Sequence, residues 1–143
     1  MPNLQVRLRR REWRAATRGG PHALGIVGER VAERVLKKQG LRLLGRNASI
    51  GGVEVDLVFL TKNNLAVAIV EVKTRHVASA AGGRFPGEAA VNPVKVRRLQ
   101  RAGRAATRAL RAPADAFQID VVVVECLGDR SAQVRWFQDC APR

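Results

Sequence analysis

The chain has 143 residues, a length that suits a single domain and excludes a large multidomain enzyme. Apolar residues make up 46% of it, and no run approaches the ~18 consecutive apolar residues that a membrane-spanning helix needs, so no membrane partner is expected. Lys and Arg number 26 against 12 acids, which gives a net charge of +14 and favours a polyanion, above all nucleic acid, as the partner.

The first 22 residues are basic and poor in apolar side chains. They include six arginines and close with Gly19, Gly20 and Pro21. We expect a flexible basic tail over residues 1–22, followed by one domain over residues 23–140. A solvated extension with no task of its own and an organelle transit peptide, which is also rich in arginine and poor in acids, are the alternatives.

The segment from about Leu24 to Gln39 has the apolar spacing of an amphipathic helix, and Gly40 is placed to end it. Glu29 lies at the edge of the apolar face of this predicted helix. A carboxylate there can point into a cleft beside the core, although a solvated helix residue would occupy the same position.

Apolar runs in the rest of the chain predict five strands and a second helix. The strands cover residues 41–46, 53–60, 65–74, 119–126 and 133–137, and the helix runs from Asn92 to about Arg111. The polar residues between the second and third strands suit a hairpin turn. The order helix, three strands, helix, two strands is typical of an α/β domain built on one mixed central sheet flanked by helices.

Charge enters the third of these strands abruptly. Residues 65–70 are apolar on both faces, as in a central strand, and Glu71 and Lys73 then project from one face beside buried residues. Burying a carboxylate and an ammonium costs several kcal/mol per ion unless each finds a partner or a metal. Glu54 and Asp56 share one face of the preceding strand, so hairpin pairing would bring them close to Glu71 and Lys73.

Such a grouping of carboxylates suits a divalent metal such as Mg²⁺ or Mn²⁺, which can activate a bound water while Lys73 offsets negative charge. A simple cross-strand ion pair explains Glu71 and Lys73 equally well when they are considered alone. The wider pattern, an acid on a helix, an acid ending one strand and Glu-x-Lys ending the next, is that of PD-(D/E)xK nucleases. It makes Glu29, Asp56, Glu71 and Lys73 the candidate catalytic residues, with Glu29, Asp56 and Glu71 as metal ligands.

The second helix is the most basic part of the chain, with seven positive charges and no acid between residues 93 and 112. Five arginines recur at helical spacing and form what we call the arginine stripe: Arg97, Arg101, Arg104, Arg108 and Arg111. Like charges on one face repel one another unless an anion neutralises them, so the stripe is expected to bind phosphate; a merely solvated face is the alternative. Lys95 and Arg75 join the stripe as expected nucleic-acid contacts, and Leu99, Ala102, Ala106 and Leu110 are expected to pack.

Several short motifs together resemble one bacterial family. They are Gly28-Glu29, Arg46-Asn47, Glu54-Val55-Asp56-Leu57-Val58, Val70-Glu71-Val72-Lys73-Thr74-Arg75, Val91 with Lys95, and Ile119-Asp120-Val121-Val122. From about Gly25 to Phe137 the chain is similar to the YraN-like proteins. The resemblance implies a restriction-endonuclease-like fold related to archaeal Holliday-junction resolvases, with the four candidate catalytic residues at resolvase-type acidic and lysine positions.

Two functions are compatible with these residues. The first is a metal-dependent endonuclease or resolvase-like protein that hydrolyses phosphodiester bonds in DNA, with Mg²⁺ or Mn²⁺ as cofactor. The second is a non-catalytic nucleic-acid-binding module on the same scaffold. A cytoplasmic location is expected, because two cysteines are too few for a disulfide framework. Pairing of two chains, to cut two strands, is left open.

Overall fold

The computed structural model describes residues 3–77 and 92–143, so Val91 of the family motifs lies outside the described residues. The elements follow the chain as β1 (Asn3–Arg7), α1 (Arg10–Arg18), α2 (Gly20–Lys38), β2 (Arg42–Ile50), β3 (Val53–Leu60), the 3-10 turn η1 (Lys62–Asn64), β4 (Val67–His76), α3 (Pro93–Ala109), β5 (Phe117–Cys126) and β6 (Ser131–Phe137). The predicted order of helix, three strands, helix and two strands is present from α2 to β6. It is preceded by β1 and α1, which were not predicted.

The strands of the described chain form one sheet in the order β1-β6-β5-β4-β3-β2. The central pair, β4 and β5, is parallel, and the other neighbouring pairs are antiparallel. Parallel strands need a crossover connection, and α3 lies within the connection from β4 to β5. The predicted α/β class, with one mixed sheet flanked by helices, is therefore confirmed.

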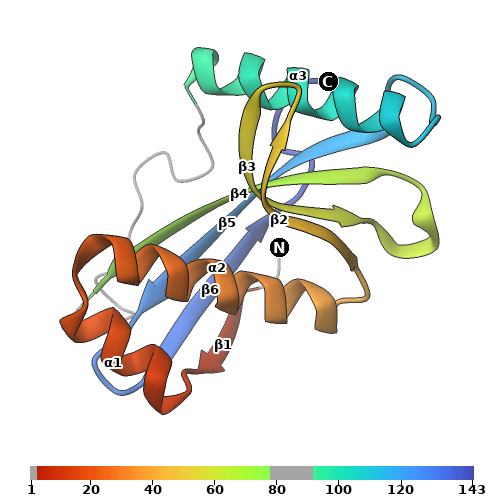
Figure 1. Cartoon of the computed structure of the whole chain (residues 1–143). Coiled ribbons are helices and arrows are strands. Elements are labelled where there is room, and N and C mark those ends of the chain that lie inside the picture. Colours follow the sequence, from red (N-terminus) through yellow and green to blue (C-terminus); the bar gives the residue numbers. More distant parts are fainter. Residues whose placement is uncertain (1–2, 78–91) are drawn as a thin grey trace.

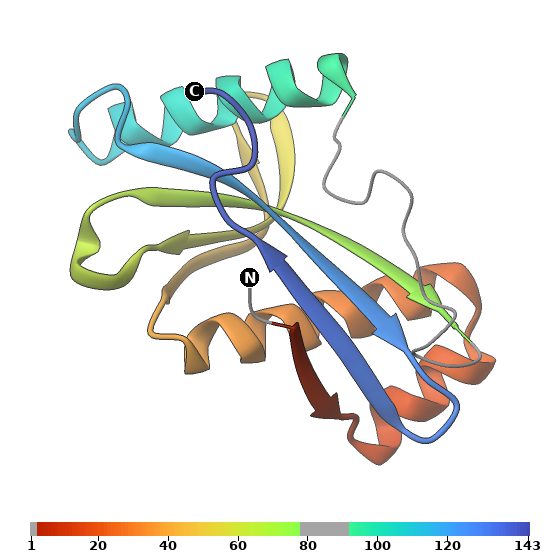
Figure 2. The same ribbon diagram turned by 180° about the vertical axis from the view of Figure 1, so that it is seen from behind.

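Helices cover both faces of this sheet (Figure 1). α1 and α2 pack on one face over the larger apolar core, and α3 packs on the other face over a smaller one. The view from behind shows the same three layers (Figure 2). Side chains of β4 serve the two cores in turn, because Ala68 and Val70 belong to the α2 core whereas Val67 and Ile69 belong to the α3 core. None of the helices in the described part of the chain has the length and apolar character needed to cross a membrane.

The flexible tail predicted for residues 1–22 is wrong, because residues 3–18 form β1 and α1. β1 adds an edge strand to the sheet by pairing antiparallel with β6. α1 packs beside α2, where the buried Glu12 carboxylate accepts hydrogen bonds from both terminal nitrogens of Arg34, at 2.9 and 3.0 Å. The sheet and the larger core therefore extend into the basic start of the chain.

An edge strand needs few apolar side chains, and this is why composition misleads here. Leu4, Val6 and Leu8 alternate with polar residues, which is the period of a strand with one buried face. Leu8 is only 2% exposed. The six arginines of this segment are all exposed, so they dominate its composition without disturbing the core.

The bounds of β3 agree with the prediction, whereas those of the other four predicted strands differ; β5 and β6 each begin two residues earlier than predicted, at Phe117 and Ser131. β4 begins at Val67, because Thr61 and Ala66 close the preceding turn through two hydrogen bonds of 2.9 Å each. Leu65, predicted to lie in the strand, is 75% exposed at the tip of this turn. β2 is longer than predicted and reaches Ile50.

α3 ends at Ala109, two residues before the predicted end. Arg111 has a φ of 54°, in the left-handed region, and its N–H donates to the carbonyl of Arg108 at 3.1 Å. Leu110 is half exposed, although it was expected to pack. The last arginine of the stripe therefore lies beyond the helix.

A close contact sets the position of α2 on the sheet. A Cβ atom added at Gly28 would lie 1.7 Å from Oγ1 of Thr74 on β4, so only glycine permits this approach. Gly25, one turn earlier in the same helix, would meet nothing within 4 Å. Because Glu29 follows Gly28 directly, the contact also sets how near the Glu29 carboxylate comes to β4.

Alanine at these two positions should have opposite effects on stability. Gly28→Ala forces α2 away from the stiff, β-branched Thr74 and should lower the free energy of unfolding by about 1–3 kcal/mol. Gly25→Ala adds no clash and removes backbone entropy from the unfolded chain, so it should raise that free energy by about 0.5–1 kcal/mol. Urea denaturation of the two variants and the wild type measures both, and equal stability of the two variants would contradict the contact.

Candidate active site

The site is built where β3 separates from β4, a place we call the fork. The antiparallel pairing of these strands runs from Leu60↔Val67 only to Leu57↔Val70. β4 continues beside β5, whereas β3 turns away towards α3 (Figure 1). At the fork, Oδ2 of Asp56 accepts a hydrogen bond of 2.8 Å from the backbone N–H of Val72. The Asp56 side chain thus satisfies a strand amide that β3 no longer pairs with.

The parting of the strands also changes which core β3 faces. Val55 packs in the α3 core, but Leu57, two residues later, packs in the α2 core. In a regular strand residues two apart share a face, so β3 twists sharply at Asp56. Asp56 therefore lies at the junction of the two cores, where its carboxylate is half-buried.

Glu71 and Lys73 extend from the α3 face of β4, in phase with Val67 and Ile69. Both are half-buried. The first turn of α3 contributes Lys95, whose Nζ lies 3.2 Å from Oε1 of Glu71. Lys95, predicted as a nucleic-acid contact, is thus an ion-pair partner of the acidic site.

Glu29 reaches the same site from α2, on the other side of the sheet. Burial raises the pKa of Glu29, and the nearby carboxylates of Asp56 and Glu71 raise it further. Burial and Asp56 likewise raise the pKa of Glu71, while Lys95 and Lys73 oppose the rise. The structure therefore brings together all four predicted catalytic residues closely enough for their charges to interact.

The carboxylates do not form a complete metal cage. Among residues 3–77 and 92–143, no three His, Cys, Asp or Glu side chains are grouped closely enough to hold an ion. Mg²⁺ commonly binds through one or two carboxylates and completes its shell with water and substrate phosphate oxygens. Asp56 and Glu71 fit that mode of binding, because burial and then the nearby Asp56 carboxylate raise the pKa of Glu71, and a bound cation would offset both effects.

His22 is a site residue that the sequence reasoning missed. It lies seven residues before Glu29, two helical turns away on the same side of α2, and its charge lowers the pKa of Glu29. The predicted helix began at about Leu24 and left His22 in the predicted tail, so helical spacing gave no signal that linked His22 to Glu29. Glu54 lies outside the cluster: it is exposed and lines a hollow of about 300 Å³ with Lys95 and Arg98.

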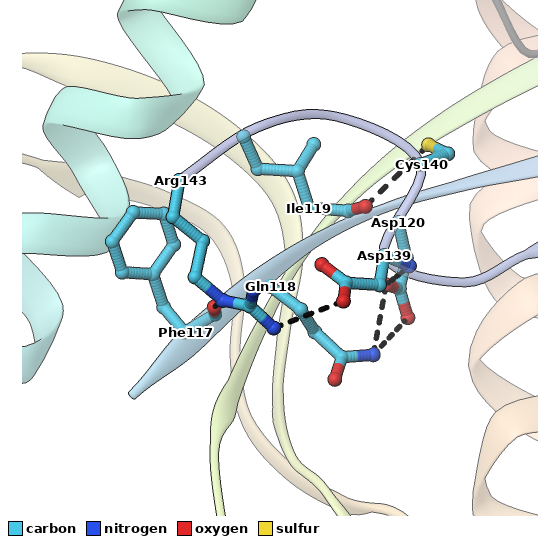
Figure 3. A network of polar contacts seen from close by, with 7 residues as sticks. All are labelled: Phe117, Gln118, Ile119, Asp120, Asp139, Cys140 and Arg143. Atoms are coloured by element: carbon cyan, nitrogen blue, oxygen red, sulfur yellow. Dashed lines mark hydrogen bonds and ion pairs between the residues drawn. The ribbon is translucent and has the colours of Figure 1, made fainter. Parts of the chain in front are cut away.

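Asp120, part of the last family motif, is a structural residue (Figure 3). Its buried carboxylate accepts hydrogen bonds from Gln118 Nε2 and from the backbone N–H of Asp139, at 2.9 Å each. Nε1 of Trp136 donates a third bond, also of 2.9 Å. Burial raises the pKa of Asp120, and these three donors oppose the rise. Asp120 therefore anchors the C-terminal segment to β5, as does the bond from Arg143 Nε to the carbonyl of Phe117.

Four members of the arginine stripe are exposed on α3: Arg97, Arg101, Arg104 and Arg108. On the opposite side of the helix Leu99, Ala102 and Ala106 are buried, as predicted. Within the described part of the chain none of the four arginines forms an ion pair. Arg75, by contrast, donates to the buried Glu125 carboxylate at 2.9 Å, as Arg135 does at 2.6 Å, so it contributes to a structural ion pair.

Residues 28–124 match the family model described as "Uncharacterised protein family UPF0102". A UPF0102 protein of Mycolicibacterium gilvum is 38% identical over 122 residues, which cover 85% of this chain and 93% of that protein. One from Beutenbergia cavernae is 41% identical over 102 residues (71% of this chain, 81% of the relative). One from Chlorobium phaeobacteroides is 33% identical over 118 residues (82% and 89%). The matched span includes the four acidic and lysine site residues.

Asp56→Asn should weaken the binding of Mg²⁺ or Mn²⁺ by at least about tenfold, because it removes one ligand charge with almost no change in volume. Glu54→Gln is the matched control, since it removes the same charge from the same strand outside the cluster. Isothermal titration calorimetry on both variants decides the point. Equal metal affinity in Asp56→Asn and wild type would remove Asp56 from the ligand set.

Glu71 also makes stability depend on pH. Its pKa is higher in the folded protein than in the unfolded chain, so the fold favours the protonated carboxyl group. Glu71 therefore stabilises the fold fully at a pH below the pKa of the unfolded chain. This contribution is lost as the pH rises through the pKa of the folded protein. Glu71→Gln should therefore be more stable than wild type at neutral pH in EDTA, and this difference should shrink as pH falls below the raised pKa. Thermal unfolding followed by circular dichroism between pH 4 and 8 tests this; a variant less stable at neutral pH would contradict it.

Proposed function

The chain belongs to the UPF0102 family, and we propose that it is a metal-dependent endonuclease of the PD-(D/E)xK type that hydrolyses phosphodiester bonds in DNA. The observation that supports this most is the meeting of Glu29, Asp56, Glu71 and Lys73 at the fork, although they come from three separate elements. Under this proposal, α2 to β5 form a restriction-endonuclease-like core. The net charge of the chain is +14, so its composition does not account for several carboxylates gathered at one place. Such a cluster, with raised pKa values, is typical of a functional site.

Asp56 and Glu71 are suited to hold Mg²⁺ or Mn²⁺, which when bound supplies positive charge at the phosphate and lowers the pKa of a water molecule. Each carboxylate is already oriented, Asp56 by the N–H of Val72 and Glu71 by Lys95. Glu29 retains its proton to a higher pH than an ordinary carboxyl group. It is therefore suited to exchange a proton with water at the site.

Lys73 has the role of balancing charge during the reaction. As the water oxygen bonds to phosphorus and the bond from phosphorus to the leaving sugar oxygen breaks, negative charge grows on the phosphate oxygens and the leaving oxygen takes up a proton. The Lys73 ammonium lies on the Glu71 side of β4 and already acts on that carboxylate. Preorganised positive charge of this kind lowers the barrier without reorganisation at the moment of reaction.

The arginine stripe supports nucleic acid as the substrate. α3 begins beside the acidic site, where Lys95 meets Glu71, and carries four exposed arginines along its outer face. Guanidinium groups bind phosphate oxygens through paired hydrogen bonds, without selecting a base sequence. A non-catalytic binding module would use the same stripe, so the test has to depend on cleavage.

Lys73→Met keeps the aliphatic stem and removes the charge. We expect this variant to bind DNA nearly as well as wild type and to lose metal-dependent cleavage by about 10²-fold or more, the scale for deleting one electrostatic stabiliser. Wild type and variant are incubated with branched, duplex and single-stranded DNA in Mg²⁺, Mn²⁺ or EDTA, and products are separated on denaturing gels. Lys62→Met, at an exposed lysine of the β3–β4 turn, is the control and should cut like wild type.

Two results would contradict the proposal in different ways. A Lys73→Met variant that cuts as fast as an active wild type would refute the role of Lys73. A wild type that binds all these substrates and cuts none of them with either metal would favour the binding module.

A further inference from the structure

A second basic surface lies on the face of the molecule opposite to α3. It is a groove of about 650 Å³ lined by charged residues of α1, α2, β2 and the β1–α1 connection. These residues are Arg9, Glu12, Arg30, Glu33, Arg34, Lys37, Lys38 and Arg46. Six cations thus face two acids, an excess of four positive charges that the sequence analysis did not assign to any role.

Both acids of this groove are already neutralised. Glu12 is paired with Arg34, and its pKa lies below the ordinary value because the hydrogen bonds from Arg34 and from the Arg9 backbone outweigh the effect of burial. Glu33 is paired with Arg46 and with Lys37, and these hydrogen bonds lower its pKa to about 2. The two carboxylates are therefore ionised at neutral pH, and each is already paired with at least one cation of the groove.

Three cations of the groove lack an ion pair within the described residues: Arg9, Arg30 and Lys38. They are exposed at a concave surface, where like charges gathered together favour the binding of an anion. The paired Arg34 and Arg46 are held in place by Glu12 and Glu33, so part of the cationic surface is preorganised.

The chemistry of the lining identifies the class of ligand. Every lining residue is charged, so the groove contains no apolar or aromatic side chain that could insert into a membrane interface or anchor a protein partner. A nucleic-acid backbone binds without apolar contacts, because phosphate contacts supply most of the affinity of non-specific nucleic-acid binding. We propose that the groove binds the phosphate backbone of nucleic acid, as a surface distinct from the arginine stripe.

The two surfaces cannot serve one straight segment of duplex. α1 and α2 lie on one face of the sheet and α3 on the other (Figures 1 and 2). A helix layer on each side of a sheet places the outer surfaces roughly 30 Å apart. One chain therefore holds two nucleic-acid segments at once, one on the groove and one on the stripe. This second step rests on the DNA binding in the proposed function, whereas phosphate binding in the groove does not.

Three variants of the full chain separate these surfaces. The groove variant is Arg9→Gln, Arg30→Gln and Lys38→Gln, which leaves the ion pairs of Glu12 and Glu33 intact. The stripe variant is Arg101→Gln, Arg104→Gln and Arg108→Gln. A third combines all six changes. The control, Arg42→Gln with Lys62→Gln, removes two exposed cations that line neither surface.

Bridging is measured at low salt as the protein-dependent capture of a fluorescent duplex by an immobilised, unlabelled duplex. EDTA is present, so the result does not depend on cleavage. Wild type and control should bridge. The groove and stripe variants should each bind a single duplex but lose bridging by about tenfold or more. The sixfold variant should not bridge, and it should bind a single duplex more weakly than either of the threefold variants. In the stripe background, the groove changes should lower the salt slope of binding by up to about three.

Bridging by a groove variant at the wild-type level would overturn the two-segment proposal and would place the bridge in a pair of chains that each use the stripe. An unchanged salt slope in the stripe background would overturn phosphate binding in the groove. Neither result bears on cleavage by Lys73 and the acids of the fork. Failure of the groove proposal and failure of the nuclease proposal are therefore distinguishable.

Discussion

The early end of the β3–β4 ladder is the constraint on which the site depends. A strand amide in a partly buried place must find an acceptor, and the Asp56 carboxylate accepts from the N–H of Val72 where β3 no longer pairs. Once released from β4, β3 twists so that Val55 faces the α3 core and Leu57 the α2 core. Charges that belong to opposite faces of the sheet, Glu29 on one side and Glu71 on the other, then act on each other at a single place.

Four acids of this protein show two kinds of environment. Glu12 and Glu33 are each paired with arginine, and the pairing holds their pKa values below the ordinary one. Glu29 and Glu71 lie near other carboxylates, and burial and repulsion raise their pKa values even though the chain has an excess of cations. The first group stabilises the fold. The fold holds the second group in an environment that disfavours the ionised carboxylate. Raised pKa values of this kind are typical of functional sites.

Much of the fold was predictable, because buried strands and amphipathic helices have strong apolar patterns. The strands from β2 to β6, the helices α2 and α3 and the mixed sheet follow from those patterns. β1 and α1 were not predictable in this way, since three alternating apolar residues among six arginines form only a weak local signal. The first segment becomes a strand because it pairs with β6. The sequence also did not reveal which arginines form ion pairs within the protein. Arg97 is exposed and Arg75 is ion-paired, yet both lie near the predicted active site, and their spacing does not distinguish them.

The sequence by itself determined which residues carry the charge and with what period. The spacing of Glu71 and Lys73 places both on one face of a strand, and Glu29 lies at the edge of a helical stripe whatever the rest of the chain does. Only the tertiary structure decided that these groups meet. Their meeting depends on the contact of Gly28 with Thr74 and on the strand break at Asp56. Both are relations between segments far apart in the chain, and local periodicity contains no information about distances between such segments.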